Sequence, residues 1–406
     1  MKVLWILPYL PWPTSSGGKT RQYHLLRNLS ARGHRITLLV QSKQALDAQT
    51  CQALEPMLER LIVLPRRALR HPQTLAAALC APWPLLATVN GLAPALSDRF
   101  EALLQERWDI VQIEHSYSFQ PYAEGLRKCS QPFVLTEHNL ESSLGGATYG
   151  RFPRWAWPFV KWDQWRCRRW ERQVFNAAQR VIAVTEADAE RMRALTRTPV
   201  DVVVNGVDCQ AFAEVHPAPA SKRVLFVGNY EYAPNVDAVQ WLLDEVAPQL
   251  WRQQPEAKLA IAGHALPASW AERWPDERIE WHGFVSDLRV LQRQCAAFVA
   301  PLRHGGGSKL KVLEALAGGL PLVSTSQGVS GLDIFSREHY LLGEDARSIA
   351  GALDELLRSP QKAAQFGEAG RQYVCLNHDW ERVAQALEQV YRQAQSMTVD
   401  VEATCA

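Results

Sequence analysis

The sequence predicts an α/β protein built from two doubly wound, Rossmann-like units with mainly parallel sheets. The chain has 406 residues, more than one typical core organises. Short apolar runs alternate with amphipathic segments and carry little polar alternation, which is typical of parallel strands covered on both faces. This alternation stops at a Pro/Ala stretch, residues 214–222, and then restarts. Each half is therefore expected to form its own sheet, with a cleft between the carboxyl ends of the two sheets.

The first half opens with a strand at 2–7, a helix at 20–34 closed by Gly33, and a strand at 35–40. Further strands are expected at 108–113, 132–136, 180–184 and 200–204. The second half repeats the pattern, with strands expected at 223–228, 258–263, 279–285, 296–302 and 321–325. A helix is expected between most successive strands, and a last amphipathic helix at 379–395.

Composition excludes several classes of protein. A formal net charge of +2 without any block of like charges argues against a nucleic-acid partner. The eight cysteines form no CxxC pair and no zinc-ligand spacing, which suits reduced thiols in the cytoplasm. The chain contains no DxD pair, so a carboxylate-held metal has no evident site and none is expected.

Two segments bear on membranes. Residues 71–97 carry no charged side chain, but four prolines make a continuous spanning helix improbable. Residues 151–172 contain five tryptophans and seven basic residues against two acidic ones, at helical spacing. Two interpretations stay open for this second segment: the tryptophans enter the core, or the segment makes peripheral contact with an anionic membrane.

Polar residues follow three predicted strands of the first half. Gly17 and Gly18, in SSGGKTR, can bring backbone amides close to an anion, although a plain loop is the alternative. The dipeptide Glu-His follows two other strands, as Glu114-His115 and Glu137-His138. Ionisable residues just past buried strands lie where ligands bind in such sheets, so at least one histidine is expected to be functional.

The stretch RHGGGSKLKVLEALAGGLP, residues 303–321, joins a strand, a glycine turn and a helix. Ser308 is the expected N-cap, and the helix N-terminus with Lys309 and Lys311 offers fixed positive charge to an anion. Glu314 is the only carboxylate of that helix and can accept two hydroxyls, as from a ribose. A solvated surface glutamate is the alternative.

These segments resemble those of family 4 glycosyltransferases with the GT-B fold, in the bacterial branch of exopolysaccharide and envelope polysaccharide pathways. SSGGKTR, VLTEHN, RVIAVTEAD, VVVNGVD, VLFVGNYEYAPNVDAV, HGFVSDL and APLRHGGGSKLKVLEALAGGLPLVST occur in the family's order over nearly the whole chain. The resemblance implies an acceptor-side domain at 1–206, rejoined by a tail helix at 379–406, and a donor-side domain at 207–378. It implies a retaining, metal-independent transfer from a UDP- or GDP-sugar to a glycan or lipid-linked acceptor.

The resemblance also implies roles for individual residues. His138 matches a histidine that bonds the donor sugar, and Glu314 matches the second glutamate of the E-x7-E motif, which holds the ribose. Lys309 is expected to stabilise the diphosphate. Lys19, His115 and Glu137 are candidates on the acceptor side. Donor contacts are expected from Gly17, Gly18, Gly228, Asn229, Phe284, Val285, His304, Gly305, Gly306, Gly307, Ser308, Leu310 and Lys311.

Two departures from the family pattern stand out. Gly306 lies eight residues before Glu314, where relatives often have the first glutamate, and GNYEYAPN at 228–235 lacks the usual Arg and Lys. Lys309, then Lys311, is the expected replacement for that charge. A sugar-nucleotide 2-epimerase and a non-catalytic sugar- or membrane-binding protein stay open as alternatives, whereas the missing GxGxxG disfavours a nicotinamide enzyme.

Overall fold

The computed structural model describes residues 1–43, 46–66, 81–91, 93–129, 131–143, 154–305 and 309–405, the side chains of Arg154 and of residues 397–405 excepted. The chain divides into two compact units: unit 1 is Met1–Val204 with Val383–Ala406, and unit 2 is Asn205–Arg382. The boundaries expected from the sequence were 206/207 and 378/379. Within the described part of the chain, no helix combines the length and apolar character needed to cross a membrane.

Unit 1 is built on a parallel sheet with seven strands among its described residues, in the order β3-β2-β1-β4-β5-β6-β7. Its central strand β1 pairs with β2 from Lys2↔Arg35 to Leu7↔Val40, and with β4 from Val3↔Ile110 to Ile6↔Ile113. The strands are β1 (Lys2–Leu7), β2 (Arg35–Ser42), β3 (Arg60–Pro65), β4 (Ile110–Glu114), β5 (Phe133–Glu137), β6 (Arg180–Ala183) and β7 (Val200–Val202).

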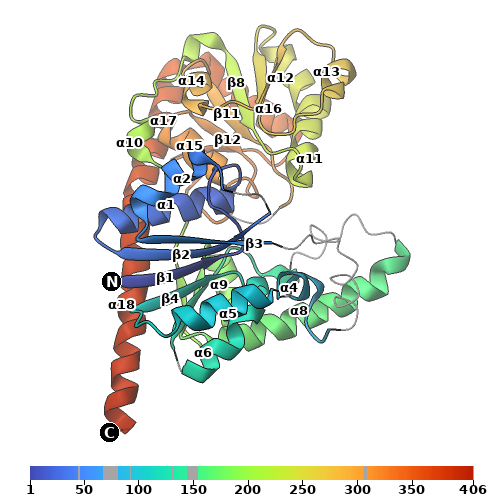
Figure 1. Cartoon of the computed structure of the whole chain (residues 1–406). Helices are drawn as coiled ribbons and strands as arrows, with labels where there is room; N and C mark the ends of the chain where they lie inside the picture. Colours follow the sequence, from blue (N-terminus) through green and yellow to red (C-terminus); the bar gives the residue numbers. More distant parts are fainter. Residues whose placement is uncertain are drawn as a thin grey trace. The chain divides into compact units, whose positions relative to one another are not determined.

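Helices cover both faces of this sheet. Figure 1 shows α1 and α2 on one side and α5, α6 and α8 on the other. On the latter side, Leu4 and Ile6 of β1 share a core cluster with Phe100, Trp170 and Phe175, which is why the strands lack polar alternation. The helices are α1 (Gly17–Ala31), α2 (Ala48–Leu54), α4 (Leu85–Gly91), α5 (Pro94–Leu103), α6 (Ala123–Cys129), α8 (Trp157–Ala177) and α9 (Glu186–Arg193).

Unit 2 holds a second parallel sheet, with six strands in its described residues and the order β10-β9-β8-β11-β12-β13. Val224 and Phe226 of β8 pack into one core cluster and Leu225 into another, so this sheet too is buried on both faces. The strands are β8 (Arg223–Val227), β9 (Lys258–Ala262), β10 (Ile279–Gly283), β11 (Ala297–Ala300), β12 (Leu322–Ser324) and β13 (Leu341–Leu342).

The helices of unit 2 occupy the connections between these strands. A π-helical segment, Leu242–Val246, joins α11 to α12. The helices are α10 (Cys209–Phe212), α11 (Ala233–Trp241), α12 (Ala247–Gln253), α13 (Ser269–Arg273), α14 (Leu288–Gln292), α15 (Leu310–Ala317), α16 (Ala346–Arg358) and α17 (Pro360–Asn377).

The last helix, α18 (Trp380–Cys405), starts in unit 2 and continues into unit 1. In unit 1 it is fixed to two elements: Arg32, next to the end of α1, bonds the carboxylate of Glu388 at 2.6 Å, and the Tyr391 hydroxyl donates to Gln112 of β4. This is the return of the tail to the N-terminal domain that the sequence predicted.

Two details of the predicted elements are wrong. Helix α1 begins at Gly17 rather than residue 20, because Ser16 takes the extended conformation of an N-cap (φ −147°, ψ 159°) and the glycines form the first turn. Helix α15 begins at Leu310 with Lys309 at the N-cap position, one residue after the expected Ser308, which lies outside the described residues. Two strands, β3 and β13, were not predicted.

Candidate functional site

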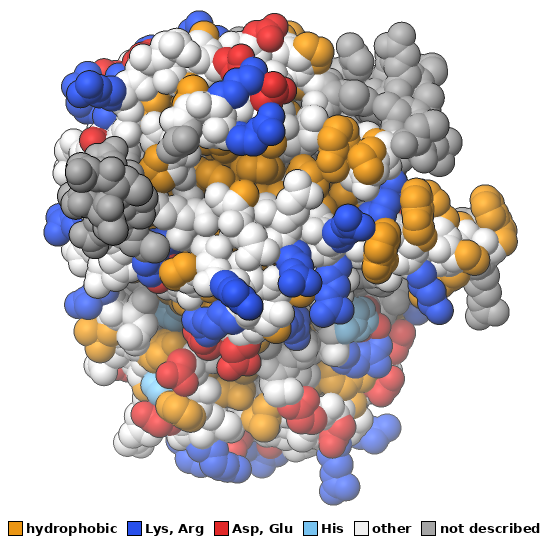
Figure 2. All heavy atoms as spheres, turned by 90° about the horizontal axis from the view of Figure 1, so that it is seen from below, with side chains coloured by type: hydrophobic (Ala, Val, Ile, Leu, Met, Phe, Trp, Pro, Cys, Tyr) orange, Lys and Arg blue, Asp and Glu red, His pale blue; other side chains and the backbone are white. Residues whose placement is uncertain are grey.

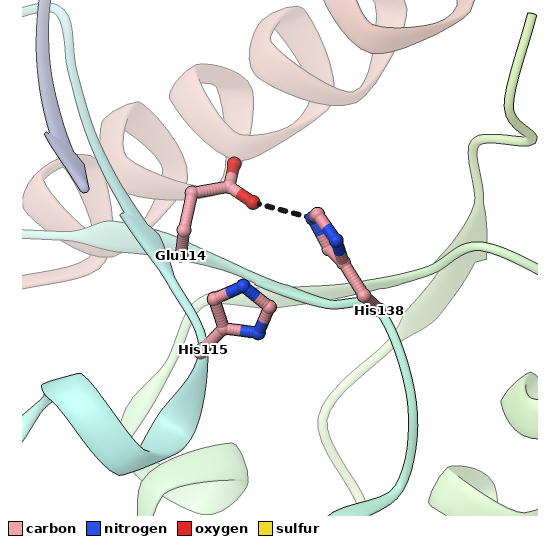
Figure 3. A group of neighbouring side chains, drawn as sticks. All are labelled: Glu114, His115 and His138. Atoms are coloured by element: carbon pink, nitrogen blue, oxygen red, sulfur yellow. Dashed lines mark hydrogen bonds and ion pairs between the residues drawn. The ribbon is translucent and has the colours of Figure 1, made fainter. Parts of the chain in front are cut away.

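The two Glu-His dipeptides come together at the carboxyl ends of β4 and β5. Glu114 and Glu137 are the last residues of these paired strands, and the rings of His115 and His138 lie with centroids 4.4 Å apart. His115 has a left-handed backbone (φ 67°), which is uncommon outside glycine and asparagine. Such local strain is frequent at functional sites. Figure 3 shows His138 facing the carboxylate of Glu114.

Glu114 fixes this group through hydrogen bonds. Its Oε1 accepts hydrogen bonds from Trp5 Nε1 (3.1 Å) and Gln112 Nε2 (2.6 Å), and its Oε2 lies 3.0 Å from His138 Nε2. Burial alone would raise the pKa of Glu114, but its bond to His138 and the nearby charges, Arg21 included, lower it. Burial lowers the pKa of His138, so a neutral imidazole donates from Nε2 to a carboxylate. This leaves His138 Nδ1 as an acceptor.

Gly18 packs directly against that ring. A Cβ added to Gly18 would lie 2.6 Å from the Tyr9 hydroxyl and 3.3 Å from His138 Nδ1. Only glycine therefore lets the first turn of α1 approach so closely. The free imidazole nitrogen and the N-terminal turn of α1, where amides are unpaired, meet at one place. Together they can bind a ligand that offers a hydroxyl to the ring and an anion to the helix.

Glu114, His115 and His138 are also the group, within the described parts of the chain, whose donor atoms could hold a metal ion: these atoms lie within 4.8 Å of one another. The donor set fits a hydrogen-bonded pair better than a metal cage. The Glu114 carboxylate already accepts three hydrogen bonds, one of them from His138 itself. A metal ion would have to replace that bond.

The three acceptor-side candidates lie in different environments. Burial lowers the pKa of His115 to about 4. Burial raises the pKa of Glu137 to about 8; its Oε1 accepts from the Ser116 amide at 2.6 Å, and its Oε2 is buried without a hydrogen-bond partner. Lys19 is half-buried in α1, where burial lowers its pKa. A neutral Glu137 next to a neutral His115 can donate or accept hydrogen bonds, but offers no fixed charge.

In unit 2, Gly305 lies in the segment between β11 and α15. Gly305 has a left-handed backbone (φ 118°), and a Cβ there would lie 3.0 Å from the Tyr232 hydroxyl. Its carbonyl accepts from Gln327 Nε2 at 2.6 Å and from Lys309 Nζ at 3.3 Å. Gly306, Gly307 and Ser308 lie outside the described residues. Lys309 is buried at the N-terminus of α15.

Lys311 connects α15 to the turn after β8. Its Nζ donates to Asn235 Oδ1 at 2.6 Å, and Asn235 Nδ2 donates to the carbonyl of Asn229 at 2.8 Å. Gly228 fits against Asn235, because a Cβ on Gly228 would lie 3.1 Å from that side chain. Burial, then the charge of Lys309, lowers the pKa of Lys311 to about 7. Near neutral pH the ligand-free protein therefore carries Lys311 in both charged and neutral forms, and its role as a charge for the diphosphate stays a prediction.

Glu314 is partly buried on α15 rather than solvated at the surface. Burial raises the pKa of its carboxyl to about 7. Among the described residues, this carboxyl has neither a hydrogen-bond donor nor a cation as partner, while the backbone carbonyl of Glu314 accepts from Gln292 at 3.3 Å. The surface interpretation is wrong. A desolvated carboxyl without a partner is a polar group with unused capacity for a ligand.

The remaining donor-side candidates lie on the rim of unit 2. Phe284 is 71% exposed and meets His264 edge-on, with centroids 6.4 Å apart, whereas Val285 packs against the core. The His304 side chain is exposed, and its Nδ1 lies 3.6 Å from Asp237. Leu310 is partly buried at the start of α15 and packs against the core.

Several residues that hold these sites were not predicted. The sequence marks Glu114 only as part of a dipeptide, and marks Trp5, Arg21 and Gln112 only as strand and helix residues. Asn235 lies far from residues 303–321 in the sequence, and Gln327 follows them closely. Trp5 and Asn235 act through contacts distant along the chain, 109 residues for Trp5–Glu114 and 76 for Asn235–Lys311. No local pattern signals such pairs.

The structure describes the tryptophan segment from residue 154 onward, mostly as α8. Its two carboxylates, Asp163 and Glu171, are fully buried, and Arg166 pairs with Asp163. The interpretation that the tryptophans enter the core holds for Trp170 alone (5% exposed) and is wrong for the other four. Those four are exposed: Trp155 by 83%, Trp157 by 51%, Trp162 by 44% and Trp165 by 58%.

Comparisons with known proteins agree with this architecture. The profile described as Glycosyltransferase Family 4 matches residues 15–211, and the profile described as Glycosyl transferases group 1 matches residues 221–359. Glycogen synthase of Mycobacterium tuberculosis is 26% identical over 408 aligned positions, which cover 96% of this chain and 94% of that protein.

Two solved structures are similar in fold. Sucrose-phosphate synthase from Thermosynechococcus elongatus has a TM-score of 0.71 at 18% identity, covering 98% of this chain and 100% of that one. Anabaena HepE in complex with UDP has a TM-score of 0.68 at 15% identity, covering 97% and 100%. The two profile matches together span most of the chain. The chain is a glycosyltransferase of the GT-B fold and belongs to glycosyltransferase family 4. Family and fold were predicted correctly from the sequence.

Proposed function

We propose that this glycosyltransferase moves a sugar from a nucleoside diphosphate sugar to a glycan or lipid-linked acceptor in polysaccharide biosynthesis, with retention and without a metal. The observation that carries the proposal is the start of α15. Lys309 lies at the helix N-terminus, Lys311 lies two residues further along, and the carboxyl of Glu314 has no partner in the described structure. Anion-binding groups and a free diol acceptor on one helix match a nucleoside diphosphate.

The similar proteins support the same donor class. HepE was solved with UDP, and two other similar proteins are named glycogen synthase and sucrose-phosphate synthase. We assign the diphosphate to the Gly305 turn and Lys309, and the ribose hydroxyls to Glu314. We assign the transferred sugar to His138, whose Nδ1 can accept from a sugar hydroxyl while Glu114 holds the ring. Lys19, His115 and Glu137 are assigned to the acceptor side.

The proposed reaction needs few reacting side chains. The bond between the sugar's anomeric carbon and the diphosphate oxygen breaks, and a bond to the acceptor oxygen forms on the same face. The acceptor hydroxyl's proton passes to the departing diphosphate oxygen. Catalysis then rests on stabilising the negative charge that develops on the diphosphate, which the N-terminus of α15 and Lys309 supply, and on positioning. No metal is required for this charge balance.

Calorimetric titration with UDP and GDP tests the donor assignment. Glu314→Ala and Lys309→Ala are each expected to weaken binding of the preferred nucleotide about tenfold, the loss of one charge-assisted contact. Glu272→Ala removes an exposed carboxylate of α13 and is the matched control, with unchanged affinity expected. Equal affinities for all four proteins would refute the assignment of the nucleotide to α15.

Product analysis tests the reaction itself. With a radiolabelled UDP- or GDP-sugar and a glycan acceptor, we expect an acceptor-dependent labelled product with retained anomeric configuration. UDP release from the donor without any acceptor would instead favour a sugar-nucleotide 2-epimerase. Binding of nucleotide without turnover, over a panel of sugars and acceptors, would favour a non-catalytic protein.

We also propose that the enzyme acts in the cytoplasm, peripherally on the inner face of the membrane, through α8. The exposed side of α8 carries tryptophans together with Lys161, Arg168, Arg169 and Arg172, and both of its acidic residues are buried. Figure 2 shows hydrophobic and basic side chains together at the projecting end of this helix. Tryptophan and basic residues on one helix suit an anionic bilayer surface. Flotation with phosphatidylglycerol vesicles at low salt tests this, and failure to float would refute it.

A further inference from the structure

A second feature of α8 lies beyond its tryptophans. A pocket of about 780 Å³ opens between the C-terminal half of α8 and the segment that follows α9. Its wall includes Trp165, Arg168, Arg169, Arg172, Arg193 and Arg197, and no carboxylate. The residues from α8 fall at spacings of three, four and seven, so they form one stripe on the exposed side of the helix. All of the lining belongs to unit 1.

The charge of this pocket is uncompensated. Arg193 pairs with Glu186 and donates to the carbonyl of Val200 at 3.1 Å. None of the other four arginines has an ion-pair partner within the described chain. Arg169 instead lies over the ring of Trp165, 5.8 Å from its centroid. Guanidinium groups that converge on a hollow without carboxylates favour an anion in that hollow.

The rim opposite α8 is fixed in place by hydrogen bonds. Thr196 Oγ1 donates to Asn176 Oδ1 of α8 at 2.8 Å, and Thr198 Oγ1 donates to the carbonyl of Phe175 at 2.8 Å. These bonds tie the segment that carries Arg197 to the end of the helix that carries Arg172. The pocket is therefore preformed, which reduces the entropy that a ligand must overcome on binding.

The chemistry of the wall selects the class of ligand. Planar guanidinium groups bind phosphate oxygens in pairs, and several of them suit a phosphate better than a single carboxylate. The volume exceeds that of one phosphate, so a phosphate with a substituent fills it better. On the same exposed side of α8, Trp162 and Trp165 lead from the pocket toward the projecting end of the helix. Their rings suit the interface of a bilayer, where phosphate and apolar groups meet.

We propose that this arginine pocket binds the phosphate headgroup of an anionic phospholipid while α8 lies on the bilayer. The proposal rests on the membrane contact proposed above and adds a defined headgroup site to it. Arg172 and Arg197, from the two walls, hold the phosphate, and the tryptophans of α8 contact the lipid interface.

Calorimetry with dihexanoyl phosphatidic acid, kept below its critical micelle concentration, tests the pocket without a bilayer. The full chain is expected to bind this soluble lipid, and Arg172→Gln/Arg197→Gln is expected to weaken binding about tenfold or more. The matched control is Arg99→Gln/Arg107→Gln, which removes two charges from exposed arginines elsewhere in unit 1. Arg168→Gln/Arg169→Gln is a second pocket variant, expected to weaken binding in the same direction. UDP binding of all variants is expected to be unchanged.

Each outcome decides the proposal. Equal losses in the pocket and control variants would refute a defined site and leave only general charge. Inorganic phosphate that binds as tightly as the lipid, with the same dependence on Arg172 and Arg197, would assign the pocket to free phosphate and overturn the lipid source. Absence of lipid binding with intact UDP binding would refute the pocket but not the transferase. Vesicle flotation that is unchanged in the pocket variants would show that α8 binds the bilayer without the headgroup site, and would overturn the role of the pocket on the bilayer.

Discussion

Replacing Glu314 with glutamine should make the ligand-free enzyme more stable and its nucleotide binding weaker. Burial raises the pKa of this carboxyl from 4.5 to about 7. That difference corresponds to about 3 kcal/mol of unfolding free energy lost when the folded protein must carry the ionised form. Because the side chain is only partly buried, solvent screening reduces the expected value to about 1–2 kcal/mol. Glutamine is neutral at every pH and removes this cost.

The sign follows from proton binding. As pH rises from 4.5 to about 7, the folded state holds the Glu314 proton more tightly than the unfolded state, so the carboxyl lowers stability progressively. Below 4.5 both states are protonated and the cost is absent. The stability gained in Glu314→Gln should therefore be near zero at the acid end of this range and reach its full value above about 7.

Urea unfolding of wild type and Glu314→Gln across this pH range measures the difference. Other buried carboxyls, such as Glu137, are common to both proteins and cancel. Calorimetry on the same samples should show nucleotide binding weakened about tenfold, because an amide replaces one of the carboxylate's acceptor oxygens with a donor. A stability difference that does not change with pH would refute the assigned burial. A pH-dependent gain with unchanged nucleotide affinity would refute the ligand role and leave a structural glutamate.

Three further substitutions test other parts of the sites. Gly18→Ala should reduce transfer about tenfold and the free energy of unfolding by about 1–3 kcal/mol, because its Cβ would lie 2.6 Å from the Tyr9 hydroxyl. Adding Tyr9→Phe should restore part of both losses in turnover and melting assays. If nothing is restored, the strain lies elsewhere. His138→Ala should lower kcat/KM about a hundredfold. It should also lower the melting temperature, because the Glu114 carboxylate loses a hydrogen-bond donor. A fall in melting temperature alone would show that His138 has only a structural role. For Lys311, protonation should strengthen binding of a diphosphate, so wild type should lose UDP affinity relative to Lys311→Gln in calorimetry as pH rises through about 7. An identical pH profile in wild type and variant would remove Lys311 from the phosphate contacts.

The strands were predictable where apolar runs are long and buried on both faces. β1 was predicted residue for residue, and β8 and β9 to within one residue. β13 has two residues, Leu341–Leu342, too few to form a pattern. β3 lies at the edge of its sheet and is only half-buried. Its residues therefore do not show the buried pattern that distinguishes a central strand from a loop. The start of α1 was misplaced because glycine favours a loop by propensity, whereas α1 begins at Gly17 and Gly18 packs against His138 within its first turn.

For the candidate site, the sequence predicted which residues lie at the ends of strands, but not how they contact one another. The two Glu-His dipeptides follow parallel strands, so their proximity follows from sheet geometry, and β4 and β5 are in fact paired. The sequence did not indicate which carboxylate bonds to which histidine. Glu114 bonds His138 rather than its own neighbour, because Trp5 and Gln112 orient its Oε1 and leave Oε2 facing the other strand. Depth of burial, which sets the pKa values of Lys311 and Glu314, also depends on distant packing.

The pKa values of Lys311 and Glu314 explain how two ionisable side chains can be buried on α15. Lys311 and Glu314 both have pKa values of about 7, one lowered and the other raised by burial. Each can therefore be neutral in the ligand-free protein near neutral pH, which limits the cost of desolvating them. A diphosphate would favour the charged form of Lys311, and hydroxyls that donate to Glu314 would favour its carboxylate. The proton taken up by one residue is then offset by the proton released from the other.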